Sequence, residues 1–297
     1  MNNQETKAFF ILLTIPVMWG ITFPLIHEIV YNYSPSLFVL WRFWLAAIVM
    51  LLPFIDAWRR RQFSRIDILY GLAIGLVNSG AFVLQAQSLL YIDSARAAFL
   101  TGMNVVMVPL LLPFFAMGRP RLIDLMAAGV CLAGIYLISG ADFRNFDDGD
   151  WLVIASALCI AIGIIITEKA SLVSNNLKLL TFYQIIFTTL VPMGVLGTQI
   201  TVIPHSQLFW WGAIYCAVIA TALPLFLQLK YQKYVGSSKV AIIFSLESVT
   251  ATFCAWLAGE KITANIIFGG LIILLSTILG NLIELFKGML RIKKTIV

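Results

Sequence analysis

The sequence is poor in charged residues for its length. Only 11% of its 297 residues are Asp, Glu, Lys or Arg, and 61% are hydrophobic, whereas an ordinary soluble domain is about 25% charged. So few charges cannot cover the surface of a water-soluble fold of this size. The apolar excess needs an apolar solvent, which the hydrocarbon core of a membrane provides.

Cysteines and catalytic motifs are also scarce. The four cysteines all fall inside apolar runs without paired spacing, so they indicate buried apolar side chains and neither a disulfide framework nor a zinc site. The sequence contains no nucleotide-binding loop, no G-x-S-x-G, no H-E-x-x-H and no paired carboxylates within an apolar run. We therefore expect no cofactor, no metal ion and no enzyme activity.

Basic residues outnumber acidic ones by six, but their placement does not indicate nucleic-acid binding. They lie in short segments between long apolar runs, as Arg59, Arg60, Arg61 and Arg65 do. We interpret this charge as a signal of membrane topology and expect no nucleic-acid partner.

The sequence contains ten apolar stretches. A helix needs about 20 apolar residues to cross a bilayer. The predicted spans are 8–30, 36–55, 67–91, 95–116, 122–139, 151–170, 179–199, 208–229, 237–258 and 262–285. The first run lacks an A-x-A cleavage pattern, so we expect it to be retained as a helix.

The basic residues also predict an orientation. If the N-terminus is placed in the cytoplasm and the spans alternate, 16 of the 20 Lys and Arg residues fall in cytoplasmic segments. Only Arg144 and Lys261 fall outside, while Arg42 and Arg96 lie within or at the ends of spans. The positive-inside rule then predicts a multi-pass inner (plasma) membrane protein with both termini in the cytoplasm.

The second half of the chain resembles the first at an offset of 143 residues. The aligned pairs are Gly20 with Gly163, Asn78 with Thr221, Gln85 with Gln228, Tyr91 with Tyr234, Arg96 with Lys239 and Asn104 with Glu247. Their shared offset indicates an internal repeat. We predict repeats over 1–140 and 151–297, joined by an extracytoplasmic linker, 141–150. Because five spans are an odd number, the two repeats must cross the membrane in opposite senses, as in many transporters.

Several segments resemble the EamA-like branch of the drug/metabolite transporter superfamily. They are WGITFP (19–24), WRFWLAA (41–47), ARAAFLTGMNVVMVPLL (95–111), SKVAIIFSLESVTATFCAWLAGEKIT (238–263) and GGLIILLSTILG (269–280). The resemblance covers almost the whole chain. One departure is Ser248, which stands where the family usually has a proline after the glutamate.

The resemblance implies an all-α membrane protein of ten transmembrane helices, built as two inverted five-helix repeats around a central cavity. It also implies ATP-independent export or exchange of amino acids, amines, drugs or related metabolites. The family is too broad to define one substrate.

Glu247 is the most informative candidate site residue. It lies about ten residues into its span, so at about 1.5 Å per residue it is roughly 15 Å deep, near the midplane. A carboxylate there costs about 2.5–3.5 kcal/mol on insertion scales. It can bind a substrate amine or carry a coupling proton; the alternative is a protonated structural group. Its repeat equivalent, Asn104, reaches the same depth and either contacts substrate or joins helices.

Matched polar residues on the third and eighth spans predict a cavity wall. Asn78 and Gln85 share one helical face, as do Thr221 and Gln228, and such a face must meet protein or water rather than lipid. Trp19 lies mid-membrane, where it either stacks on substrate or packs in the core. Tyr183 in the seventh span is a weaker candidate of the same kind. All of these residues have packing as the alternative role.

Three cations complete the candidate set. Arg42 lies about six residues inside its span, where it either extends toward the interface or binds a carboxylate with two hydrogen bonds. Arg96 and Lys239 lie at the starts of equivalent helices near opposite membrane faces. We expect both residues to act either as interfacial anchors or in gating.

These observations predict a secondary transporter whose partners are a small metabolite and the lipid bilayer. A membrane-embedded enzyme or lipid-handling protein and a receptor without flux are the alternatives. Substrate turnover would identify the first alternative, and ligand binding without translocation the second. The sequence is compatible with a monomer or a homodimer.

Overall fold

The computed structural model describes residues 3–139, 147–201, 203–259, 264–265, 267–273 and 275–276. Within these ranges the regular structure is helical throughout, as predicted. Seven helical segments are long and apolar enough to cross a membrane, or eight if the pair that bends by 45° at Met50 counts as one span. The predicted all-α membrane fold is confirmed.

The described part of the first half, residues 3–139, contains nine α-helices and one 3₁₀ turn. They are α1 (Asn3–Leu12), α2 (Thr14–Gly20), α3 (Thr22–Val30), α4 (Pro35–Val49), α5 (Leu51–Arg59), α6 (Arg65–Ser88), α7 (Ser94–Thr101), α8 (Asn104–Leu111), η1 (Leu112–Phe115) and α9 (Leu122–Ser139). Several predicted spans are thus interrupted: α1 to α3 form the first, α4 and α5 the second, and α7, α8 and η1 the fourth.

The described residues between 264 and 276 are helical, and residues 147–201 and 203–259 of the second half contain seven α-helices and three shorter turns. They are α10 (Asp148–Val173), α11 (Leu177–Thr188), α12 (Leu190–Leu196), η3 (Gly197–Thr201), α13 (Gln207–Ala217), η4 (Val218–Ala222), α14 (Leu223–Tyr231), η5 (Gln232–Tyr234), α15 (Ser237–Phe244) and α16 (Leu246–Leu257). Nine of the ten predicted spans therefore correspond to helical segments, and most of the tenth, 262–285, lies outside the described residues.

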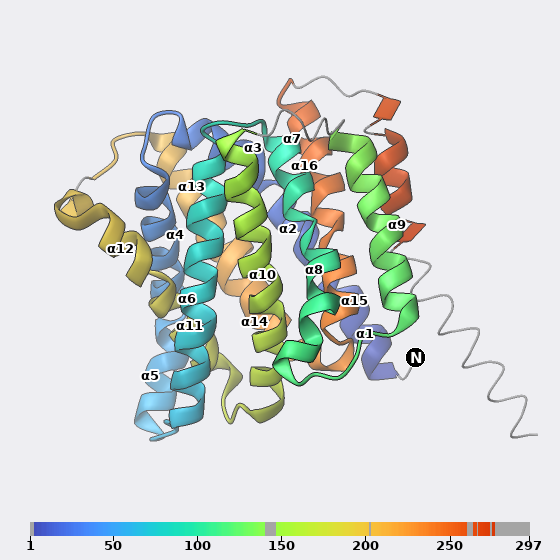
Figure 1. Cartoon of the computed structure of the whole chain (residues 1–297). Helices are drawn as coiled ribbons and strands as arrows, with labels where there is room; N and C mark the ends of the chain where they lie inside the picture. Colours follow the sequence, from blue (N-terminus) through green and yellow to red (C-terminus); the bar gives the residue numbers. More distant parts are fainter. Residues whose placement is uncertain are drawn as a thin grey trace, which may run out of the picture.

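The two halves run in opposite directions. In Figure 1, α1 begins at the lower end of the molecule and α10, its repeat equivalent, begins at the upper end. Likewise α7 begins at the upper end and α15 at the lower end. This arrangement is the inverted repeat predicted from the odd number of spans.

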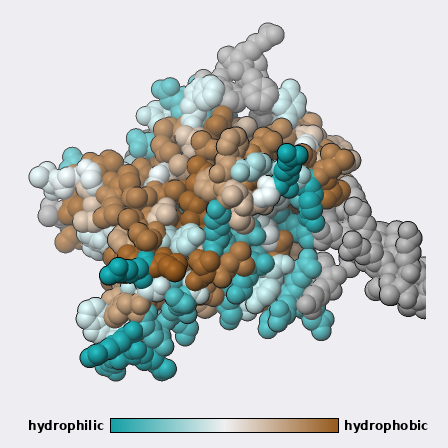
Figure 2. Space-filling view, turned by 60° about the horizontal axis from the view of Figure 1, so that its bottom comes forward, coloured by the Kyte–Doolittle hydropathy of each residue, from teal (hydrophilic) through white to brown (hydrophobic). Residues whose placement is uncertain are grey.

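The outer surface is apolar. Leu52, Phe114 and Trp211 are each more than two-thirds exposed, and Figure 2 shows hydrophobic side chains over much of the visible face, with hydrophilic ones gathered toward the lower end of Figure 1. In water such exposure would be unfavourable by about 25 cal/mol per Å². In a bilayer these side chains meet lipid instead.

Close helix contacts between the two halves hold the centre of the fold. Helix α2 packs against α16 at Gly20, where an added Cβ would lie 2.7 Å from the backbone nitrogen of Ala251. Helix α6 packs against α11 at Gly71 and Gly75. Small residues permit such approaches in membrane proteins.

The fourth span of each repeat is interrupted at equivalent positions. The break between α7 and α8 begins at Gly102, and the break between α15 and α16 is at Ser245, 143 residues later. Asn104 therefore begins α8, and Glu247 is the second residue of α16. The interruption forms without the proline that is absent at Ser248.

Candidate functional site

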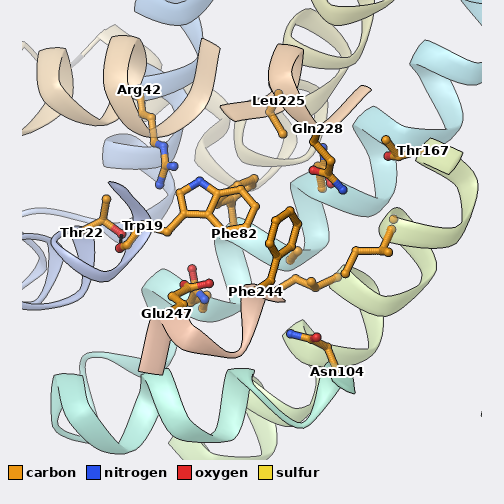
Figure 3. A pocket seen from close by; sticks show the side chains of 16 residues that line it. Trp19, Thr22, Arg42, Phe82, Asn104, Thr167, Leu225, Gln228, Phe244 and Glu247 are labelled. Carbon is orange, nitrogen blue, oxygen red and sulfur yellow. Dashed lines mark hydrogen bonds between the residues drawn. The ribbon is translucent and has the colours of Figure 1, made fainter. Parts of the chain in front are cut away.

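A cavity lies between the two repeats. The space not filled by atoms within it and at its opening is about 670 Å³. Its lining comes from both halves of the chain (Figure 3). The lining residues are Trp19, Thr22, Arg42, Asn78, Ala81, Phe82, Gln85, Asn104, Ile160, Gly163, Ile164, Thr167, Leu225, Gln228, Phe244 and Glu247.

Arg42 on α4 is the cation of this cavity, and its side chain is held in place by the other repeat. Its Nε donates to the hydroxyl of Thr221 at 2.7 Å and its Nη2 to the carbonyl of Ala220 at 2.9 Å. Its guanidinium carbon lies 4.5 Å from the centre of the Phe82 ring, which is a favourable cation–π distance. Arginine carries five N–H donors, so other donors remain for an occupant of the cavity.

The carbonyl of Ala220 is available because of Pro224. In a regular α-helix this carbonyl would accept a hydrogen bond from the nitrogen of residue 224, and proline has no N–H. The preceding turn, η4, is also π-helical, a deviation that is frequent at functional sites. Trp19 Nε1 donates to the same carbonyl at 2.9 Å, so one backbone oxygen positions both Arg42 and Trp19.

Replacing Pro224 by alanine is therefore expected to weaken ligand binding while the protein still folds. The variant regains a backbone N–H that competes with Arg42 and Trp19 for the carbonyl of Ala220. Losing one charge-assisted hydrogen bond of about 1.5–3 kcal/mol corresponds to roughly tenfold or more in affinity. Binding to purified protein, followed by calorimetry, is the measurement.

The matched control for this prediction is Pro109→Ala. Pro109 also lies inside a helix, α8, but it does not line the cavity. Equal affinity losses in the two variants would contradict a specific role for Pro224.

Glu247 is the acid of the cavity. It is 9% exposed, and in the described part of the chain no hydrogen bond or ion pair joins its carboxylate to another group. In particular, it does not form an ion pair with Arg42, although both line the same cavity. In the view of Figure 3 the ring of Trp19 lies between them.

Asn104 lies near the other side of this space. Its Nδ2 donates to the carbonyl of Thr101 at 2.8 Å, while its Oδ1 is buried without a hydrogen-bond partner. Gln85 Nε2 donates to the hydroxyl of Thr101 at 3.2 Å. A buried polar atom without a partner costs about 1–3 kcal/mol, so a donor on an occupant of the cavity would be favourable there.

Gln228 is held by its neighbour one helical turn later. Its Nε2 donates to Gln232 at 2.9 Å, and Gln232 donates in turn to the carbonyl of Ile164 at 2.6 Å.

Asn78, on α6, lies opposite Gly163 on α10. Because Gly163 has no side chain, there is space for Asn78 here: an added Cβ on Gly163 would lie 3.3 Å from the amide oxygen of Asn78.

Seven of the eight substrate-binding residues predicted from the sequence line this cavity. The exception is Tyr183. Its ring packs on Phe187, with 6.3 Å between ring centres, and the side chain contacts α6 at Gly71. The structure therefore places Tyr183 at a helix contact and away from the cavity.

The predicted gating residues lie outside the cavity and have acidic partners. Arg96 binds Asp150 through two hydrogen bonds of 2.7 and 2.6 Å, and Lys239 lies 3.0 Å from Glu5. The sequence analysis did not predict Asp150 and Glu5 as partners of these two cations.

Other parts of the site were also missed. Phe82 and Phe244 line the cavity, and the ring of Phe244 packs edge-on against Trp19 with 4.9 Å between ring centres. Thr22 and Thr167 line it as well. At the repeat offset, Phe82 aligns with Leu225, Thr22 with Ile165 and Thr167 with Pro24, so the comparison of polar residues between the halves gives no signal for these three.

Comparison with known proteins decides the family. The profile of the EamA-like transporter family matches the chain twice, over residues 6–140 and 148–282. The chain belongs to the EamA-like transporter family. It is therefore a multi-pass membrane transporter of the drug/metabolite transporter superfamily, as the motifs in the sequence suggested.

Two relatives of this EamA-like protein are also described as transporters. An uncharacterized transporter of Archaeoglobus fulgidus is 29% identical over 276 residues, covering 91% of this chain and 84% of that protein. The uncharacterized transporter YyaM of Bacillus subtilis is 22% identical and covers 98% and 97% of the two chains. A crystal structure with 14% identity superposes with a TM-score of 0.74 over 94% of this chain and 97% of its own, which shows a shared fold.

Proposed function

We propose that this EamA-like protein moves amino acids or closely related zwitterionic amines across the membrane by alternating access, with the substrate held between Arg42 and Glu247. One observation carries the proposal: a buried guanidinium and a buried carboxylate line the same cavity without forming an ion pair. Burying two unpaired charges is expensive. An occupant that carries both charges would offset the cost for both residues at once.

A zwitterion fits this pair better than a singly charged compound. Its carboxylate would accept from the free donors of Arg42, and its ammonium group would donate to Glu247 and to the unpaired oxygen of Asn104. Charge-assisted hydrogen bonds of this kind contribute about 1.5–3 kcal/mol each. The side chain of the substrate would face Phe82, Phe244 and Leu225, so apolar side chains are favoured.

The surroundings support transport rather than storage. Both repeats contribute to the lining, and substrate sites of inverted-repeat transporters lie at such an interface. The distribution of Lys and Arg favours an inner-membrane protein with both termini in the cytoplasm. Membership of the EamA-like family favours export or exchange as the activity.

Ligands that differ by one charged group test this function. We expect leucine to raise the melting temperature of the purified protein, since a ligand at a hundredfold its Kd stabilises the folded state by about 2.7 kcal/mol. The compound lacking the carboxylate, 3-methylbutylamine, and the compound lacking the amine, 4-methylpentanoate, should each stabilise less. The same series is then repeated with other amino acids.

Two outcomes would contradict the proposal. If the amine alone stabilises as well as the amino acid, then Arg42 does not bind a substrate carboxylate. If no amino acid stabilises the protein, the substrate belongs to another class.

A further inference from the structure

Two ion pairs at opposite ends of the molecule have the same construction. Arg96 binds Asp150 with a shortest distance of 2.6 Å, and Lys239 binds Glu5 at 3.0 Å. Each of the four residues is the third residue of its helix: α7, α10, α15 and α1, respectively. In both pairs, therefore, the first turns of two helices meet.

The helix dipole does not explain why Arg96 and Lys239 lie in the first turns of their helices. The N-terminal turn of a helix carries partial positive charge, which favours acids such as Asp150 and Glu5 and disfavours Arg96 and Lys239. An acid on a neighbouring helix offsets this unfavourable placement. Each cation is thus best explained by the contact that it makes with its partner helix.

Both contacts join one repeat to the other. Arg96 belongs to the fourth span of the first repeat and Asp150 to the first span of the second. Lys239 belongs to the fourth span of the second repeat and Glu5 to the first span of the first. Arg96 and Lys239 are separated by the repeat offset of 143 residues, so the two pairs are related by the internal symmetry.

The pairs lie at opposite ends of the cavity region. In Figure 1, α7 and α10 begin at the upper end, and α1 and α15 begin at the lower end. Asp150 is fully buried and Arg96 is 34% exposed by side chain; Lys239 and Glu5 are 11% and 24% exposed. Partial burial protects both pairs from full screening by water and salt.

We propose that these two ion pairs are reciprocal clamps, each of which closes the repeat interface at its own end and opens when the protein exposes the cavity there. The inference extends the proposed transport by alternating access and assigns Asp150 and Glu5 as the partners of the two cations. Opening one clamp costs one ion pair while the other stays formed. Their relative strength then sets which face of the membrane the cavity meets more often.

Cysteine accessibility tests the clamps without any substrate. Thr167→Cys places a thiol in the cavity lining, and a charged, membrane-impermeant thiol reagent is applied to right-side-out and inside-out membrane vesicles. The chain without this substitution gives the background from its native cysteines, of which Cys131 and Cys216 are buried.

Each clamp variant should change labelling from one face. With the N-terminus in the cytoplasm, Lys239→Gln is expected to raise labelling from the cytoplasmic face by about fivefold, a shift that corresponds to about 1 kcal/mol. Arg96→Gln is expected to raise labelling from the opposite face. If the chain is inserted the other way, both responses exchange faces, which still supports the clamps.

Two further variants make the test specific. The double exchange E5K/K239E keeps an ion pair across the same contact and should return labelling toward the parent level. The control is Arg60→Gln, which removes one partner of an exposed pair at the C-terminal end of α5 (Arg60 with Asp56), and should leave labelling unchanged.

The proposal is overturned if Arg96→Gln and Lys239→Gln act on the same face, or if neither exceeds the Arg60→Gln control. It is also overturned if the exchange variant folds, as judged by size-exclusion chromatography, but labels like Lys239→Gln. Because labelling needs no substrate, a positive result would stand even if no amino acid were transported.

Discussion

Replacing Glu247 by glutamine is expected to lower transport of amine-bearing substrates by roughly tenfold to a hundredfold. The substitution keeps the shape of the side chain and removes its charge, so the substrate ammonium loses a charge-assisted hydrogen bond of about 1.5–3 kcal/mol. Uptake of labelled amino acid into vesicles at equal protein content measures the effect. Glu28→Gln, the same change at an exposed position on α3, is the control and should transport normally.

The same variant separates two roles for Glu247. If the carboxylate binds the substrate amine, both substrate exchange and accumulation against a gradient fall. If it carries a coupling proton, exchange survives and proton-driven accumulation alone is lost, which would contradict the amine-binding account. Normal transport in both assays would make Glu247 a structural group.

Replacing Gly20 by alanine is expected to cause the largest loss of stability among single-methyl changes in this fold. An added Cβ would lie 2.6 Å from the Cβ of Thr250 and 2.7 Å from the backbone nitrogen of Ala251. Helices α2 and α16 must therefore separate, which would also break the bond of 2.8 Å from the Thr250 hydroxyl to the carbonyl of Pro16. Overpacking of this kind costs typically about 1–3 kcal/mol.

Thermal unfolding in detergent, followed by size-exclusion chromatography, measures this effect. Gly194→Ala is the matched control, because an added Cβ at Gly194 meets nothing within 4 Å. Alanine has a helix propensity about 1 kcal/mol better than glycine, so the control should be as stable as the natural protein or slightly more stable. A Gly20→Ala protein that melts with the control would mean that α2 and α16 are not in tight contact.

The sequence predicted the polar part of the site because two signals coincide there. Polar residues within apolar spans must face protein or water, and the repeat offset pairs Gln85 with Gln228 and Asn104 with Glu247. Depth along a span then brings all four to the middle of the membrane. Periodicity and symmetry are properties of the chain itself, so no structure was needed to find them.

The parts that the sequence did not reveal depend on contacts between distant segments. The carbonyl of Ala220 binds Trp19 and Arg42 from 201 and 178 residues away. Backbone groups leave no signature in residue type, although Pro224 marks a missing donor. Asp150 and Glu5 were missed because acids near helix starts are common for reasons of capping and dipole alone.

Tyr183 shows how a neighbouring helix decides the direction of a side chain. Its span carries polar and aromatic residues around much of its circumference, so the pattern alone does not show which face meets the cavity. Gly71 and Gly75 on α6 leave room for α11 to approach closely, and Tyr183 lies in that contact. Helix packing therefore removes it from the cavity.

Counterflow in proteoliposomes is the most direct test of the central claim, which is that Arg42 and Glu247 bind a substrate that the protein moves across the membrane. Vesicles containing the purified protein are loaded with unlabelled leucine and diluted into labelled leucine. We predict rapid labelled uptake by the natural protein and strongly reduced uptake by both Glu247→Gln and Arg42→Gln. Uptake that equals that of protein-free vesicles for leucine and for every other amino acid tested, or full uptake by both variants, would contradict the account.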